Sequence, residues 1–196
     1  MKVIFLIILS YLIGCFSSAY LIGKVFKKID IRTYGSGNAG ATNAVRVMGK
    51  KLGVLTFLLD FFKGFIAVFI GYWILGYNGG LIAAICVVFG HDFPIFLGFK
   101  GGKGIATTIG VMAVLNFPAA LVSVIIGLIV GVVSRYVSLG SIVFLIINPV
   151  MNAIIIKEFN PNLLLTTIVL ALVGLFRHKS NIQRLINGNE NKIGKR

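Results

Sequence analysis

Long apolar runs with almost no charge recur along the whole chain, and they restrict its fold more than any other feature. Three of them, at 3–23, 53–76 and 81–97, are long enough for a helix that crosses a bilayer, which takes roughly 20 residues. Hydrophobic residues make up 58% of the chain and charged residues only 12%, and the mean hydropathy is +0.99. These values lie outside the range of soluble domains. The sequence therefore predicts an all-α, polytopic integral membrane protein.

The second half of the chain adds four further spans. A single helix over 105–133 would be about 43 Å long, whereas the hydrocarbon core is about 30 Å thick. Asn116-Phe117-Pro118 interrupts this stretch with residues that break helices. We therefore expect two short helices there, with a re-entrant loop as the alternative. Spans at 138–156 and 162–177 bring the predicted number to seven.

The positive charges predict how these spans are oriented. Sixteen of the nineteen Lys and Arg residues fall at 24–52, 98–104, Arg135 and 177–196, which seven spans place on one side of the membrane. The positive-inside rule makes that side cytoplasmic, so we expect the N-terminus outside and the C-terminus in the cytoplasm. The opposite loops then carry one cation, Lys157. A net charge of +14 in this arrangement favours anionic lipids or phosphorylated metabolites as partners, and no nucleic acid is expected.

Two charges lie inside an apolar run. Asp60 and Lys63 are three residues apart, which puts them on one face of a helix. Charged residues inside a membrane are costly and usually functional. We expect either a structural ion pair or one wall of an active site.

A glycine-rich segment follows the first span. Its glycines permit backbone conformations that direct N–H groups at an anion, while its hydroxyl and amide side chains add neutral donors and its arginine adds a charge. The alternative is an ordinary flexible loop. We expect a site for a phosphate or polar headgroup, and its residues are Gly35, Ser36, Gly37, Asn38, Gly40, Thr42, Asn43 and Arg46.

A second segment joins a histidine to a Gly-Gly-Lys-Gly turn that opens a helix. Backbone N–H groups, a helix N-terminus and a lysine can together hold one anion. The spacing is not that of a nucleotide-binding P-loop, because Gly104 stands where a Ser or Thr would meet magnesium. His91 is either a hydrogen-bonded structural residue or a base. The candidate residues are His91, Gly101, Gly102, Lys103, Gly104 and Thr107.

The third segment lies near the C-terminus. If it is helical, Arg177, His178, Asn181 and Arg184 share one face. The alternative is an amphipathic helix that rests on anionic lipid, but few apolar residues supply its other face. We favour a functional site.

Together, these three segments resemble the bacterial acyl-phosphate:glycerol-3-phosphate acyltransferases, the PlsY family, over essentially the whole chain. The resemblance implies a single membrane-embedded acyltransferase domain over 1–196. It implies transfer of a fatty acyl group from acyl-phosphate to the 1-hydroxyl of glycerol 3-phosphate, which yields lysophosphatidic acid and inorganic phosphate for phospholipid biosynthesis. The expected location is the bacterial plasma (inner) membrane, with the active site facing the cytoplasm. No cofactor or metal is expected.

The resemblance and the chemistry of the segments suggest roles for individual residues. Catalytic roles are expected for Ser36, Arg46, Lys103, His178 and Asn181. Substrate binding is expected for Gly35, Gly37, Asn38, Gly40, Thr42, Asn43, His91, Gly101, Gly102, Gly104, Thr107 and Arg184. We expect a structural role for Glu190, and hydrogen bonding rather than nucleophilic attack by Ser36. The general base is either His178 or a phosphate oxygen of the substrate.

Two other classes remain open at this point. A small-anion or solute transporter also combines short helices, many glycines and basic loops, but transporters place polar groups near the bilayer midplane. Here the polar residues gather at one face. A lipid-binding or scaffold protein would bind the same ligands without turnover.

Overall fold

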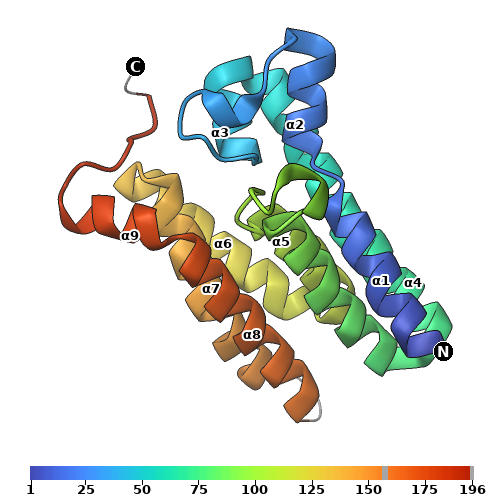
Figure 1. The fold of residues 1–196 in the computed structure, drawn as a ribbon. Helices are drawn as coiled ribbons and strands as arrows, with labels where there is room; N and C mark the ends of the chain where they lie inside the picture. The colour runs from blue at the N-terminus through green and yellow to red at the C-terminus, as the bar shows by residue number, and fades with distance from the viewer. Residues whose placement is uncertain (156–158, 195–196) are drawn as a thin grey trace. The chain divides into compact units, whose positions relative to one another are not determined.

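A computed structural model describes residues 1–155 and 159–194. The chain forms two compact units, Met1–Leu115 and Asn116–Arg196, and each is described by itself (Figure 1). The described residues form helices and connecting segments, with no β-strand among them. The all-α prediction is therefore confirmed for this part of the chain.

The first unit consists of one very long helical element and several shorter ones. The α-helices are α1 (Lys2–Cys15), α2 (Ser18–Ile22), α3 (Ala41–Met48), α4 (Lys50–Asp92) and α5 (Ile105–Leu115). A π-helical turn covers Gly23–Lys27, and 3₁₀ turns cover Ile31–Thr33 and Ile95–Leu97. The second unit contains α6 (Phe117–Ser134), α7 (Val137–Ile154), α8 (Pro161–Arg177) and α9 (Lys179–Ile186).

The long element α4 is a helical hairpin. Its 43 residues would extend about 65 Å as one straight helix. The backbone leaves the helical region at Leu75 (φ −137°, ψ 20°) and at Gly76 (φ 62°, ψ −153°), a conformation that glycine adopts without strain. A Cβ atom on Gly71 would collide with the carbonyl oxygen of Gly79, so residues on either side of the break lie in contact. The two arms correspond to the predicted span 53–76 and to the first part of the predicted span 81–97, because α4 ends at Asp92.

The first predicted span, 3–23, is interrupted. Helix α1 ends at Cys15, and Phe16 and Ser17 have extended backbone before α2 begins. Gly14 packs against Gly90 at the end of α4, where a Cβ atom on either residue would run into the backbone of the other helix. Small residues allow this close helix approach in membranes. The break therefore lies beside the end of α4.

The predicted break near Asn116 is confirmed. Helix α5 ends at Leu115, and the side chain of Asn116 caps α6 by accepting a hydrogen bond from the N–H of Ala119 at 3.3 Å. Pro118 occupies the first turn of α6, where its missing N–H is tolerated. In the second unit, Gly127 and Gly140 bring α6 against α7. The end of the predicted span 138–156 and Lys157 lie outside the described residues.

The described helices fit a membrane protein. Four are long and apolar enough to cross a bilayer, or five if α8 and α9, which meet at a bend of 60°, count as one span. Helix α5, at about 16 Å, is shorter than the hydrocarbon core. The number of seven spans and their orientation remain predictions.

Candidate active site

The first glycine segment is held in shape by Asn43. This side chain is 1% exposed, and its Oδ1 accepts a hydrogen bond from the Ser36 N–H at 2.9 Å. Its Nδ2 donates to the carbonyl oxygens of Ile31 at 3.2 Å and Tyr34 at 3.0 Å. Both amide protons are therefore used by the loop's own backbone, so Asn43 shapes the loop and has no amide proton left for a substrate.

The loop presents several other groups outward. Gly35 (φ 60°) and Gly37 (φ 72°) have left-handed backbone, which explains why glycine occupies both positions. The side chains of Ser36, Thr42 and Arg46 are exposed. Thr42 and Arg46 lie one turn apart on α3, which begins directly after the loop. The segment therefore offers a hydroxyl pair and a cation beside a helix N-terminus.

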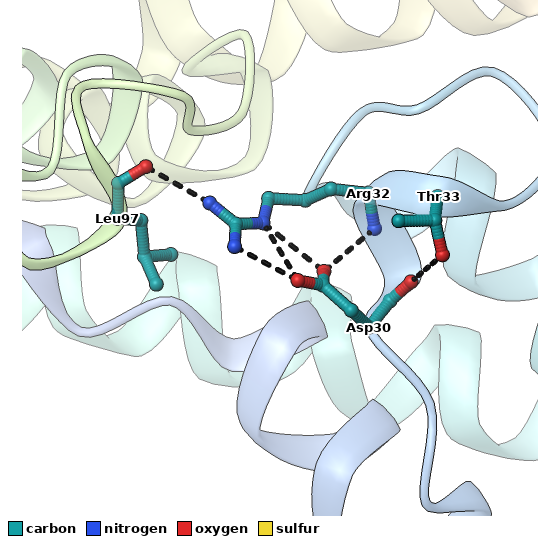
Figure 2. Close-up of polar contacts among 4 residues, drawn as sticks. All are labelled: Asp30, Arg32, Thr33 and Leu97. Carbon is teal, nitrogen blue, oxygen red and sulfur yellow. Dashed lines mark hydrogen bonds and ion pairs between the residues drawn. The ribbon is translucent and has the colours of Figure 1, made fainter.

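Arg32 connects this region to the second glycine segment (Figure 2). Its Nη2 lies 2.8 Å from Oδ2 of Asp30, and its Nη1 donates to the carbonyl oxygen of Leu97 at 2.9 Å. The hydrogen bonds from Arg32 lower the pKa of the Asp30 carboxyl. Asp30 in turn caps the 3₁₀ turn by accepting from the Arg32 N–H at 3.0 Å. Sequence reasoning missed this link, because neither residue belongs to a recognised motif.

The second segment folds tightly over the end of α4. The N–H of Gly102 donates to the carbonyl oxygen of His91 at 3.1 Å. A Cβ atom on Gly101 would collide with that oxygen, and one on Gly102 would collide with the His91 ring at Nε2. Gly104 has a left-handed backbone, φ 72°, directly before α5 begins. The turn thus leads from His91 to a helix N-terminus, with the half-buried Lys103 between.

Thr107 packs against the first arm of α4. It is fully buried, and its carbonyl oxygen and methyl group lie against Gly64. Helix α5 turns this face towards α4, whose glycine leaves room for it. Substrate binding by Thr107 stays a prediction.

Asp60 and Lys63 form a buried ion pair. The distance from Lys63 Nζ to Asp60 Oδ1 is 3.0 Å, and both side chains are at most 5% exposed. Nζ also donates to the carbonyl oxygens of Gly14 at 3.1 Å and Phe16 at 2.6 Å, and it lies 2.8 Å from His91 Nδ1. Lys63 thus donates hydrogen bonds to carbonyl groups that lack a helical partner because of the break after α1.

The third segment is bent at His178. Helix α8 ends at Arg177, α9 begins at Lys179, and their axes differ by 60°. The shared face expected for Arg177, His178, Asn181 and Arg184 required one continuous helix, and the bend shows that this condition is not met. At the corner, both the backbone N–H and Nδ1 of His178 lie within 3.0 Å of the carbonyl oxygen of Gly174. A carbonyl oxygen only accepts, so Nδ1 carries the proton and Nε2 carries the lone pair of the neutral ring.

Glu190 links the end of the chain to α9. Its Oε2 accepts from Asn181 Nδ2 at 3.1 Å and from Arg184 Nε at 3.2 Å. Its Oε1 accepts from the N–H of Asn191 at 3.0 Å. The carboxylate is buried and charge-paired, which is the geometry of a clamp.

These contacts group the candidate residues in two sets. In the first unit, Arg32 connects the two glycine segments, and the Asp60–Lys63 pair contacts His91 directly. In the second unit, Glu190 gathers Asn181 and Arg184. The sequence indicated Asp60 and Lys63 as a pair but gave no sign of their connection to His91.

Comparisons with known proteins define the class to which this chain belongs. Residues 4–188 match the family model described as glycerol-3-phosphate acyltransferase. A glycerol-3-phosphate acyltransferase from Thermoanaerobacter pseudethanolicus is 47% identical over 96% of this chain and 94% of its own length. A second relative, glycerol-3-phosphate acyltransferase 2 from Thermotoga maritima, is 43% identical over 95% of this chain and 94% of its own.

Solved structures agree with these relatives. The crystal structure of PlsY, an integral membrane glycerol 3-phosphate acyltransferase, in its glycerol 3-phosphate form has a TM-score of 0.93 and 39% identity. The comparison covers 99% of this chain and 96% of that one. The lysophosphatidic acid form gives a TM-score of 0.91. The chain belongs to the glycerol-3-phosphate acyltransferase family, and it is an all-helical membrane protein.

Proposed function

We propose that this protein transfers a fatty acyl group from acyl-phosphate to the 1-hydroxyl of glycerol 3-phosphate, giving lysophosphatidic acid and inorganic phosphate. The observation that carries the proposal is the family match over nearly the whole chain, together with a similar structure described as a glycerol 3-phosphate form. Nothing in these findings supports the transporter alternative.

Phosphate binding is assigned to the two glycine segments. The turn from Gly101 to Gly104, with Lys103, suits one phosphate because its backbone is tightly folded and leads into the N-terminus of α5. Arg46 adds a fixed charge from α3, and Arg184 is assigned the same kind of role. Asn38 and the exposed hydroxyls of Ser36 and Thr42 are assigned to the second phosphate or to the acyl carbonyl. Asn43 holds their loop in shape.

The reaction is a direct acyl transfer. The 1-hydroxyl oxygen of glycerol 3-phosphate attacks the carbonyl carbon, and the bond from that carbon to the phosphate oxygen breaks. The phosphate leaves with the electron pair, while the hydroxyl proton passes to a base. Because phosphate is already a good leaving group, positioning and neutralisation of charge supply most of the acceleration. Cations and backbone N–H groups are suited to that task.

His178 is the protein's candidate for the base. Its Nδ1–H donates to the carbonyl oxygen of Gly174, so the neutral ring has its lone pair on Nε2, as a proton acceptor requires. A phosphate oxygen of the substrate is the other candidate. Glu190 is assigned a structural role, since its carboxylate is paired with Arg184 and Asn181.

The sidedness of the reaction follows from the charges. We assign the basic segments, and the substrates that they bind, to the cytoplasmic side of the bacterial plasma membrane, with seven spans and the N-terminus outside. A donor with an apolar tail and an acceptor dissolved in water can meet at such a surface.

Product analysis tests the proposed activity. The purified protein in lipidic mesophase is given glycerol 3-phosphate with palmitoyl-phosphate or with palmitoyl-CoA, and the lipid products are identified by mass spectrometry. The proposal is supported if lysophosphatidic acid forms with palmitoyl-phosphate and not with palmitoyl-CoA as the donor. The opposite result would reject acyl-phosphate as the donor. Binding of the substrates without any product would favour a lipid-binding protein.

A further inference from the structure

The buried charges of α4 contact His91, and the ring of His91 lies against the second glycine segment. Lys63 Nζ contacts Asp60 on one side and His91 Nδ1 on the other, and all three residues are at most 6% exposed. The hydroxyl of Ser18 also donates a hydrogen bond to Asp60 Oδ1 at 2.8 Å. One positive and one negative charge are thus buried together, which avoids the cost of an unpaired charge.

This arrangement selects one tautomer of His91. Lys63 Nζ has three protons and no lone pair, and it shares them among His91 Nδ1 at 2.8 Å, Asp60 Oδ1 and the carbonyl oxygens of Gly14 and Phe16. Because the ammonium group offers nothing for an Nδ1 proton to bond, we infer that Nδ1 faces it as an acceptor. The ring proton of neutral His91 is then on Nε2. The distance from Nδ1 to Asp60 Oδ1 is longer, 3.5 Å, which agrees with this assignment.

The same ring forms the floor of the glycine turn. The Nε2 edge of His91 lies against Gly102, where even a Cβ atom would collide with it. The backbone of the two residues is also joined, because the Gly102 N–H donates to the His91 carbonyl oxygen at 3.1 Å. Movement of the His91 ring would therefore be transmitted to the residue next to Lys103.

We propose that Asp60, Lys63 and His91 form a buried positioning device that fixes His91 with its proton on Nε2 and thereby holds the Gly101–Gly104 turn in the shape that binds a phosphate group. The three residues act through the turn and not on the reacting atoms. The proposal rests on the proposed function and narrows it, because it assigns the phosphate of glycerol 3-phosphate to this turn.

Histidine spectroscopy tests the tautomer independently of activity. The chain has only two histidines, and the structure assigns them opposite tautomers, Nε2–H for His91 and Nδ1–H for His178. Untagged protein labelled with ¹⁵N-histidine should give one spectrum of each type in detergent, assigned with a His178→Gln variant. Two rings of the same type, or Nδ1–H on His91, would overturn the proposal.

Kinetics test the connection to the turn. The double variant Asp60→Leu with Lys63→Met removes both charges together, so neither remains buried alone. We expect the KM for glycerol 3-phosphate to rise by about tenfold to about a hundredfold, as a displaced binding group would cause, with kcat changed much less. Lys51→Met, an exposed lysine at the start of the same helix, is the matched control and should behave like the parent.

These experiments distinguish a failure of the Asp60–Lys63–His91 device from a failure of the proposed acyltransferase function. A folded double variant with the parent's KM would overturn the device, and so would a loss confined to kcat. Should the double variant not fold, Lys63→Arg takes its place. An unchanged Nε2–H signal with near-parent KM is the result expected, and a His91 that changes to Nδ1–H without any change in KM would overturn the device. A parent that releases no phosphate would instead reject the proposed function, while the histidine spectra would still decide the tautomer.

Discussion

At the scale of single residues, the second glycine segment leaves no space beneath it for a side chain. Gly101 lies on the carbonyl oxygen of His91, and Gly102 lies on its ring. The sequence indicated an anion site here from the glycines and Lys103 alone. It could not indicate that one glycine serves to accommodate a histidine, because that contact depends on how the turn folds back over α4.

Gly102→Ala tests this contact. The added methyl group would press on the His91 ring, and we expect the KM for glycerol 3-phosphate to rise by about tenfold because the turn shifts. Steady-state kinetics with varied glycerol 3-phosphate measure the change. Gly131→Ala is the control, since the atoms nearest to its Cβ position are at an ordinary 3.7 Å. Equal KM values in the two variants would contradict the contact.

Asp30 provides a test through pH. Hydrogen bonds from Arg32 lower the pKa of its carboxyl in the folded protein, so the ion pair stabilises the fold above the ordinary Asp value, about pH 4, and this contribution disappears as the pH falls through the lowered pKa. We expect the melting temperature of the parent to fall more on acidification from about pH 5 to about pH 3 than that of Asp30→Asn. Parallel curves for the two proteins would show that the pair does not stabilise the fold.

At the scale of elements, the sequence predicted the helices better than their interruptions. Asn116-Phe117-Pro118 predicted the end of α5 correctly, because proline and an asparagine cap have local effects. The break after Cys15 has no such local signal in an apolar run. Its carbonyl groups are satisfied by Lys63, which is distant in sequence. The bend at His178 also has no local signal, since the helical periodicity of the polar residues continues across it.

The hairpin of α4 depends on small residues where its arms meet. A Cβ atom on Gly71 would collide with the carbonyl oxygen of Gly79, so Gly71→Ala forces the arms apart. We expect a loss of about 1–3 kcal/mol in the free energy of unfolding, as in other overpacked sites. Thermal or denaturant unfolding in detergent measures it, again with Gly131→Ala for comparison. A variant as stable as the parent would show that the arms do not pack closely at this point.

At the scale of the whole molecule, the distribution of charge carries information that the fold alone does not contain. The positive-inside rule applies to loops, and it predicts seven spans with the N-terminus outside. The described helices account for four or five spans by length and composition. Seven spans would require that the two arms of α4 count separately, that α8 and α9 count as one span and that the short helix α5 also crosses the membrane.

Labelling of single cysteines tests the predicted topology. In a background without Cys15 and Cys86, Asn78→Cys lies two residues after the break in α4 and Lys100→Cys lies in the second glycine segment. A maleimide that cannot cross membranes should label position 78 in whole spheroplasts and position 100 only after lysis. The reverse pattern would invert the orientation and place the basic segments outside.

Phosphate release by two matched lysine variants tests whether the glycine turn is the phosphate site of an acyltransferase. Lys103→Ala and Lys100→Ala remove two cations three residues apart on the same segment, of which only Lys103 is half-buried in the glycine turn. With palmitoyl-phosphate and glycerol 3-phosphate both present, the parent and Lys100→Ala should release phosphate at similar rates. Lys103→Ala should lose at least about a hundredfold, the typical effect of removing one charge-stabilising group. Equal activity of the two variants, or release without glycerol 3-phosphate, would contradict the assignment of this turn as the phosphate site of an acyltransferase.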